Sequence, residues 1–142
     1  MTSSGDSYSD MPNVEPVIAY LDERFGLDTL WLYGSQAAGT ATRESDIDLA
    51  GLFRRRPGVA ELFEARGELG ARLGHDVDLV DLDRVSPILA MQVLRKGRLV
   101  LDRNPGRRAR FVAAAPSRYE DVRIMRREVE RALVARVKRG RA

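Results

Sequence analysis

Two aspartates placed two residues apart at the start of an apolar run most restrict how this chain can fold. Asp46 and Asp48 open the run DIDLAGLF, residues 46–53, whose alternation predicts a strand. Side chains alternate along a strand, so Ile47 and Leu49 are expected on one face and the two aspartates on the other. Two like charges this close repel each other unless a cation offsets them. The strand is therefore predicted to carry a site as well as part of a core.

The turn that precedes this strand supplies a different chemistry. Gly34-Ser35 ends a short apolar run, residues 28–33, and Ser35 is a predicted helix N-cap. Glycine lets the backbone approach a ligand closely, and free N–H groups at a helix start, with the Ser35 hydroxyl, bind anions. Mg²⁺ prefers one or two carboxylates together with substrate phosphates. We therefore expect phosphates at Gly34-Ser35 and one or two Mg²⁺ ions at Asp46 and Asp48.

A third carboxylate is expected from the run HDVDLVDL, residues 75–82, which also alternates and predicts another strand. Asp78 is in register to complete the metal site or to act as a general base. Asp76 shares its face and is the second candidate. The alternative is that Asp76, Asp78 and Asp81 are solvent-facing residues of an edge strand.

The remaining pattern predicts an α/β or α+β fold with a small mixed sheet of about four strands and helices packed on it. The predicted strands cover residues 28–33, 46–53, 75–82 and 98–101. The first predicted helix begins at Pro12 or Pro16 and runs to about residue 25, and further helices are predicted over residues 57–73 and 86–97, before a tail of one or two helices. The positions expected to face the core are Val17, Tyr20, Leu21 and Phe25 in the first helix and Leu62, Phe63, Leu69 and Leu73 in the second. Trp31 and Tyr33 are expected to be packing residues.

The domain organisation follows from composition and charge. Residues 1–12 are predicted to be a flexible leader, and residues 13–142 a single domain that ends in an amphipathic basic helix. Residues 103–142 contain 13 Arg and Lys against 4 Asp and Glu, so their net charge is +9 while the whole chain carries +3. The apolar stripe of the tail is Val122, Met125, Val129, Leu133 and Val137. Because basic and apolar residues interleave, nucleic-acid binding is disfavoured, and docking on an acidic partner surface through Arg123, Arg126 and Arg127 is a hypothesis.

Composition excludes several other classes. The chain has no cysteine and a single histidine, so disulfides, thiolate chemistry and histidine-based zinc sites are excluded, and any metal must be held by oxygen. No apolar run approaches the roughly 18–20 residues that cross a bilayer, and the first residues lack a signal-peptide core. A cytoplasmic location is expected.

Gly34-Ser35, ten further residues, Asp46-Ile47-Asp48 and the later run VDLVDL together resemble the minimal nucleotidyltransferase (MNT) family of the polymerase-β-like superfamily. The resemblance implies a nucleotidyltransferase fold, Mg²⁺-dependent transfer of a nucleoside monophosphate, and Asp46, Asp48 and Asp78 as metal-binding and catalytic carboxylates. Family members often have Ala-Arg-Gly in the turn where this chain has Ala37-Ala38-Gly39. Arg43 is close enough in sequence to take the place of that arginine at the phosphates.

Stand-alone MNT proteins of this size resemble the antitoxins of HEPN/MNT toxin–antitoxin pairs. The resemblance implies that ATP is the substrate, that AMP is transferred to a tyrosine of a HEPN-domain RNase toxin, and that a hetero-oligomer forms with that toxin. Two alternatives remain open: an antitoxin that neutralises by binding and masking alone, with a vestigial site, and a small-molecule nucleotidyltransferase. The short chain disfavours the second alternative, because a single domain is expected to take its acceptor surface from another protein.

Overall fold

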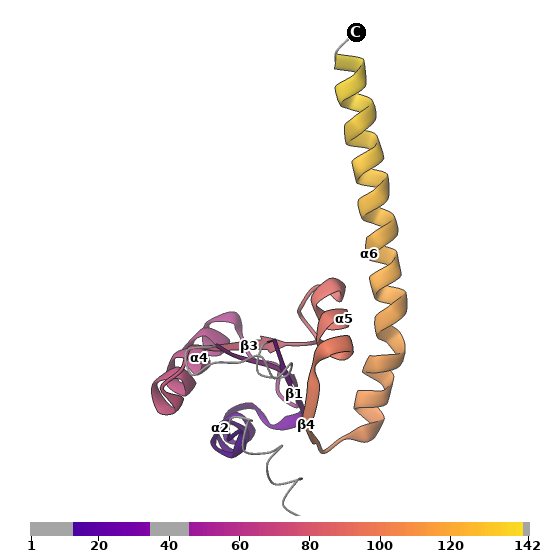
Figure 1. Ribbon diagram of the computed structural model, residues 1–142. Coiled ribbons are helices and arrows are strands. Elements are labelled where there is room, and N and C mark those ends of the chain that lie inside the picture. The colour runs from indigo at the N-terminus through magenta and orange to yellow at the C-terminus, as the bar shows by residue number, and fades with distance from the viewer. Residues whose placement is uncertain (1–12, 35–45, 141–142) are drawn as a thin grey trace, which may run out of the picture.

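The computed structural model of the chain describes residues 13–34 and 46–140, and in this part four strands form one mixed sheet with helices packed on it (Figure 1). The elements are α2 (Glu15–Phe25), β1 (Leu27–Tyr33), β2 (Ile47–Phe53), α4 (Val59–Leu73), β3 (Val77–Asp81), α5 (Pro87–Lys96), β4 (Arg98–Asp102) and α6 (Pro105–Gly140). The predicted fold class is confirmed, and so is the order of the elements that the structure describes. The helical turn predicted to begin at Ser35 lies outside the described residues. The predicted leader, residues 1–12, lies outside the described residues, and the division into leader and single domain stays a prediction.

The strands are ordered β3-β2-β1-β4 across the sheet. β1 pairs antiparallel with both β2 and β4, and β2 pairs parallel with β3. This order places β3 and β4 at the two edges and β1 and β2 at the centre. Both central strands are buried along almost their whole length.

Each face of the sheet packs against a different set of helices. One face carries Leu30, Leu32 and Leu49 and is covered by α2 and α4. The other face carries Trp31 and Ala50 and is covered by α5 and the first turns of α6. The alternation predicted for the strand 46–53 is therefore confirmed, since neighbouring residues of β2 join different clusters. Burial of these apolar side chains is the main force that holds the sheet and helices together.

The helices begin and end where the sequence signals indicate. Gly26 ends α2 with a φ of 69°, a conformation that favours glycine, and its N–H bonds the Asp22 carbonyl. The Ser86 side chain accepts a hydrogen bond from the Leu89 N–H at 3.2 Å and so caps α5. The four predicted core positions of the first helix are all buried: Val17, Tyr20, Leu21 and Phe25.

One predicted core residue of α4 is wrong. Phe63 is 76% exposed, whereas Leu62 and Leu69 are buried and Leu73 is partly buried. The buried stripe of α4 runs through Leu62, Ala65 and Leu69, which recur at spacings of three and four residues. Phe63 follows Leu62 by one residue, and a step of one residue rotates a side chain by about 100° around the helix.

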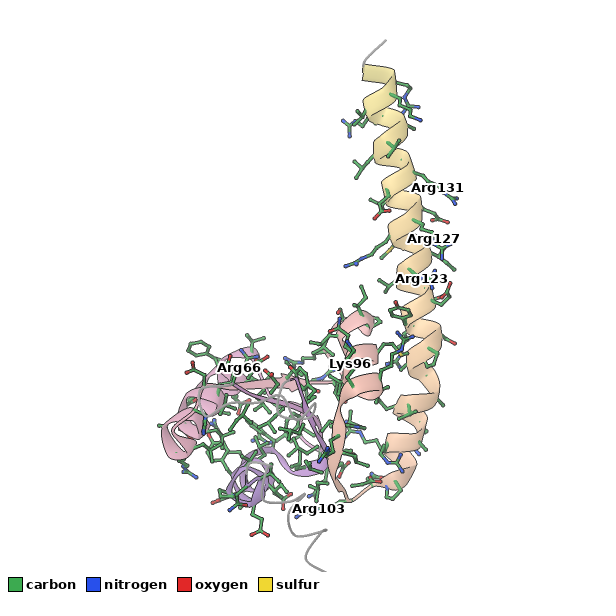
Figure 2. The ribbon with its side chains drawn as sticks, viewed as in Figure 1. Arg66, Lys96, Arg103, Arg123, Arg127 and Arg131 are labelled. Carbon is green, nitrogen blue, oxygen red and sulfur yellow. The ribbon has the colours of Figure 1, made fainter. Side chains whose placement is uncertain are left out.

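The tail forms one helix, α6, which runs past α5 and continues away from the sheet (Figure 1). Phe111 and Ala115 are its buried residues. The apolar stripe predicted on the tail is helical, but Met125, Val129, Leu133 and Val137 are all exposed within the described chain. Figure 2 shows Arg123, Arg127 and Arg131 spaced along the same outer part of the helix. The stripe therefore does not contribute to the core of the described chain.

Buried charge fastens the start of α6 to the beginning of β1. Asp28 is buried, and its carboxylate accepts hydrogen bonds from Arg107 at 3.1 Å and from Asn104 at 3.3 Å. Arg107 also donates to the Phe53 carbonyl at 2.7 Å and pairs with Asp83 at 2.6 Å. A buried carboxylate needs such partners because an unpaired charge is costly away from water.

Phe111 is the side chain of α6 that should matter most for stability, because its ring packs 6.4 Å from that of Trp31. We expect Phe111→Ala to lower the free energy of unfolding by about 3 kcal/mol. The neighbouring Val112 is half-exposed on the same helix. Val112→Ala should therefore change the free energy of unfolding by less than about 0.5 kcal/mol. Urea unfolding of both variants measures the difference. Equal effects at the two positions would contradict the packing described for α6.

Candidate active site

Asp46 and Asp48 lie at the start of β2 on the sheet face opposite to the core under α2 and α4. Ile47 and Leu49, the residues that alternate with them, are buried in that core. Asp46 is exposed and Asp48 is half-buried. The strand thus places the two carboxylates on one side, as its alternation predicts.

Asp78 joins them because β3 runs parallel to β2 in a register that sets Asp78 beside Asp48. On the other side of β2, Tyr33 of β1 is the partner of Asp48. Tyr33, Asp48 and Asp78 therefore form a row across three adjacent strands. The sequence left Asp76 and Asp78 as alternatives, and the register brings Asp78 to the row. Asp76 precedes β3, is exposed, and accepts a hydrogen bond from the Ile47 N–H through its backbone carbonyl at 2.9 Å.

The alternative prediction, that Asp76, Asp78 and Asp81 all face solvent on an edge strand, is wrong for Asp81. Its side chain is only 3% exposed, although β3 is an edge strand. Asp81 lies 4.0 Å from Arg56 and 3.8 Å from Arg84, and it accepts a hydrogen bond from the Asp83 N–H. It is thus a structural carboxylate at the far end of the strand from Asp78.

The electrostatics of the row centre on Asp48. Burial raises the pKa of the Asp48 carboxyl, and the nearby charges of Asp78 and then Asp46 raise it further. Each cause disfavours the ionised form of the group. A cation placed among these carboxylates would act in the opposite direction and favour the charged state.

Gly34 is required by the position of Asp48. Its φ of +73° is a backbone conformation that side chains rarely adopt, and a Cβ at this position would lie 2.2 Å from Asp48 Oδ2. The glycine therefore makes room for a carboxylate as well as for the turn. The predicted role of Gly34 in holding phosphate stays a prediction, and Ser35 and Arg43, the other predicted phosphate-binding residues, lie outside the described residues.

Two residues beside Asp78 were not predicted from the sequence to belong to the site. Tyr33 donates a hydrogen bond from its hydroxyl to Asp78 Oδ2 at 3.2 Å. Burial raises the pKa of Tyr33, and the charges of Asp78 and Asp48 raise it further, so the hydroxyl stays protonated and can donate. Arg66 of α4 places its Nε 3.5 Å from Asp78 Oδ1. Trp31, in contrast, is a packing residue as predicted.

The sequence position of Tyr33, directly before Gly34, could have indicated that it belongs to the site. Antiparallel pairing of β1 with β2 sets Tyr33 opposite Asp48. No sequence signal marked Arg66. It reaches the site from a helix that is separated from β3 by a turn, and its side chain donates to the Leu79 carbonyl from Nε at 3.0 Å and from Nη2 at 2.8 Å.

The donor set fits a magnesium ion bound together with a nucleotide. Within residues 13–34 and 46–140, no three acidic or histidine side chains group closely enough to hold a metal by themselves. Asp46 and Asp48 nevertheless supply the one or two carboxylates that Mg²⁺ takes when phosphates complete its shell. The parallel register sets Asp78 beside Asp48, so a cation here would also reduce the repulsion between neighbouring carboxylates. Whether Asp78 is a third ligand stays a prediction.

We call Asp46, Asp48 and Asp78 together the acidic row. The fold and the acidic row are those of a class of proteins that transfers nucleotidyl groups. The sequence profile described as "Polymerase beta, Nucleotidyltransferase" matches residues 15–106, and the chain belongs to this family. The described elements contain no helix with the length and apolar character that a membrane crossing requires.

Two curated relatives share one description, "Protein adenylyltransferase MntA". The protein from Shewanella oneidensis is 39% identical over 72 residues, which cover 51% of this chain and 52% of the relative. The protein from Thermococcus cleftensis is 36% identical over 76 residues, which cover 54% of this chain and 77% of the relative. The match thus spans about half the length of the Shewanella protein and more of the Thermococcus protein.

Several solved structures to which the chain is similar are described as toxin–antitoxin complexes. A crystal structure of a toxin–antitoxin with AMP-PNP superimposes with a TM-score of 0.76 at 28% identity, covering 86% of this chain and 98% of the matched chain. A tri-AMPylated Shewanella oneidensis HEPN toxin in complex with MNT antitoxin gives a TM-score of 0.71 at 25% identity, covering 86% and 96%. The similarity extends beyond the matched family profile to most of the chain.

Gly34→Ala should disturb the site through a single methyl group. The left-handed backbone costs about 1–2 kcal/mol for a residue with a Cβ, and the new atom must displace the Asp48 carboxylate. We expect a lower free energy of unfolding and at least a tenfold weaker affinity for Mn²⁺, measured by electron paramagnetic resonance. Gly67→Ala is the control, since nothing in the described chain lies within 4 Å of a Cβ there. An unchanged Mn²⁺ affinity in Gly34→Ala would contradict the role given to Gly34.

Asp48→Asn should stabilise the metal-free protein at neutral pH. The pKa of Asp48 is higher in the folded than in the unfolded chain, so the folded state binds more protons and stability falls as pH rises through that window. In EDTA we expect a higher Tm for Asp48→Asn at pH 7 and a smaller difference near pH 4, about the ordinary carboxyl pKa. Asp76→Asn, at an exposed position, should leave the Tm unchanged at both pH values. Added Mg²⁺ should raise the Tm of the unsubstituted protein more than that of Asp48→Asn.

Proposed function

We propose that the chain is a Mg²⁺-dependent protein adenylyltransferase that acts as an antitoxin and transfers AMP from ATP to a tyrosine of a HEPN-domain toxin. The observation that carries the proposal is the row formed by Asp48 and Asp78, with Asp46 on the same face and Gly34 beside it. Membership of the nucleotidyltransferase family supports the reaction type. The descriptions of the relatives and of the similar complexes support the nucleotide, the protein acceptor and the toxin partner.

In the proposed reaction the acidic row binds the reacting end of ATP. Asp46 and Asp48 would hold Mg²⁺, which supplies positive charge against the triphosphate and the leaving group. The acceptor tyrosine oxygen bonds to the α-phosphorus, and the bond from that phosphorus to the β-bridging oxygen breaks, so pyrophosphate leaves. Asp78 takes the proton of the acceptor hydroxyl. Gly34, with Ser35 and Arg43, is proposed to hold the phosphates.

The outer part of α6 supports a protein partner. Its exposed apolar side chains, among them Met125, Val129 and Leu133, have no cover within the described chain. Arg123 and Arg127 lie 3.7 and 3.8 Å from Glu120 of the same helix, so docking on an acidic partner through these arginines stays a hypothesis. A hetero-oligomer with the toxin is part of the proposal, and because the reaction consumes ATP we place it in the cytoplasm.

The activity test is transfer of label from ATP labelled at the α-phosphate to a purified HEPN toxin in the presence of Mg²⁺. We expect the unsubstituted protein to label the toxin, and Asp78→Asn to lower the rate by about 10²–10⁴-fold, the range for loss of a general base. Asp76→Asn is the matched control, because it changes the neighbouring exposed aspartate and should retain the rate.

The same variants separate catalysis from masking. If the toxin is neutralised by AMPylation, the double variant Asp46→Asn/Asp48→Asn should bind the toxin but fail to protect cells from it. Full protection by that variant would support neutralisation by binding alone and contradict the proposed function, as would the absence of label on the toxin.

A further inference from the structure

Each of the two carboxylate oxygens of Asp78 has its own partner within residues 13–34 and 46–140. Tyr33 donates to Oδ2 at 3.2 Å, and Arg66 lies 3.5 Å from Oδ1. The two partners come from different elements, β1 and α4, and each contacts a different oxygen of Asp78. A carboxylate held at both oxygens has little freedom to rotate about its terminal bond.

The Tyr33 contact spans the sheet. Tyr33 and Asp78 both pair with Asp48, one on each side of β2, so the hydroxyl crosses above the central strand to reach the edge strand. The ring of Tyr33 packs against the cluster that contains Trp31 and Val80, which fixes the direction of the hydroxyl. The Tyr33 hydroxyl is a neutral donor, so its hydrogen bond to Asp78 adds no charge to an acidic face.

The Arg66 contact is fixed from the edge of the sheet. Nε and Nη2 both donate to the Leu79 carbonyl, at 3.0 and 2.8 Å, and this pair of bonds holds the guanidinium in one plane. Figure 2 shows Arg66 on α4, at the side of the sheet where β3 forms the edge. The guanidinium therefore sits beside Asp78 whether or not the carboxylate is charged.

Stability does not account for this arrangement. The side chains of Arg66 and Asp78 are 37% and 45% exposed, and ion pairs at that exposure contribute little to folding. The register places Asp78 beside Asp48, so like charges are gathered at this end of the sheet at a cost to folding. Partners that orient a reacting or metal-binding group are commonly found in such surroundings.

We propose that Tyr33 and Arg66 are positioning residues that hold the Asp78 carboxylate beside Asp48 for the transfer reaction. The part of the test that measures toxin labelling rests on the proposed function. It assigns no chemical step to either residue: Tyr33 sets the position of Oδ2 and Arg66 that of Oδ1. The consequence is that the third carboxylate of the site is oriented before metal or nucleotide binds.

The variants that test the proposal remove one contact each. Tyr33→Phe deletes the hydroxyl and keeps the ring, and Arg66→Gln deletes the guanidinium. We expect each to lower kcat for toxin labelling by about tenfold, with KM for ATP changed by less than about twofold. Arg66→Lys, which restores the charge and a donor for the Leu79 carbonyl, should recover part of the loss.

The second measurement needs neither ATP nor toxin. Affinity for Mn²⁺ alone, read by electron paramagnetic resonance, should fall by about tenfold in Tyr33→Phe and Arg66→Gln. Urea unfolding checks that the variants are folded. Matched controls are Tyr119→Phe and Arg72→Gln, whose side chains contact Arg95 and the Tyr20 ring and lie away from the acidic row.

The two measurements distinguish failure of this inference from failure of the proposed function. Loss of kcat or of Mn²⁺ affinity in both site variants, with both controls unaffected, supports the positioning role. Retention of both quantities within about twofold, or equal losses in the controls, overturns it. If the unsubstituted protein labels no toxin, the proposed function fails while the Mn²⁺ measurement still decides whether Tyr33 and Arg66 position Asp78.

Discussion

Repulsion among carboxylates on one face of the sheet is the constraint on which the site depends. Asp46 and Asp48 share that face because they alternate with Ile47 and Leu49, which are buried on the other side. Parallel pairing of β2 with β3 then adds Asp78 to the same place. Asp48 cannot move away with its strand, because β2 is a central strand whose opposite face is core. The hydrophobic packing of the sheet therefore forces together charges that would otherwise separate.

Three neighbouring residues accommodate these carboxylates, each in a different way. Gly34 has no Cβ, so the Asp48 carboxylate has space that any other residue would fill. Tyr33 gives a hydrogen bond to Asp78 and brings no charge. Arg66 brings a positive charge to the same carboxylate and satisfies the Leu79 carbonyl at the exposed edge. Burial and the charges of Asp78 and Asp46 raise the pKa of Asp48, which is the cost that remains at this carboxylate.

The sequence predicted those features that follow from local periodicity. The alternation of β2, the paired aspartates, the Gly-Ser turn before them and the cap of α5 at Ser86 each depend on a few neighbouring residues, and the structure confirms the fold that they imply. Phe63 was misplaced because one residue of rotation separates the buried and exposed sides of α4. The position of Asp78 beside Asp48 depends on the register of two strands, and that of Arg66 on the packing of a helix against a sheet edge. No single-sequence pattern records either of these.

The charge of the row also bears on the order in which ligands bind. A triphosphate approaching Asp46, Asp48 and Asp78 meets negative charge, and a magnesium ion without nucleotide lacks the phosphate oxygens that complete its coordination shell. Each ligand removes an obstacle to the other, since the cation neutralises the row and the phosphates complete the cation's shell. Such reciprocal assistance is positive coupling between the two binding equilibria. Because protonation of Asp48 would remove the charge that attracts the cation, this coupling should weaken as pH falls into the range where Asp48 titrates.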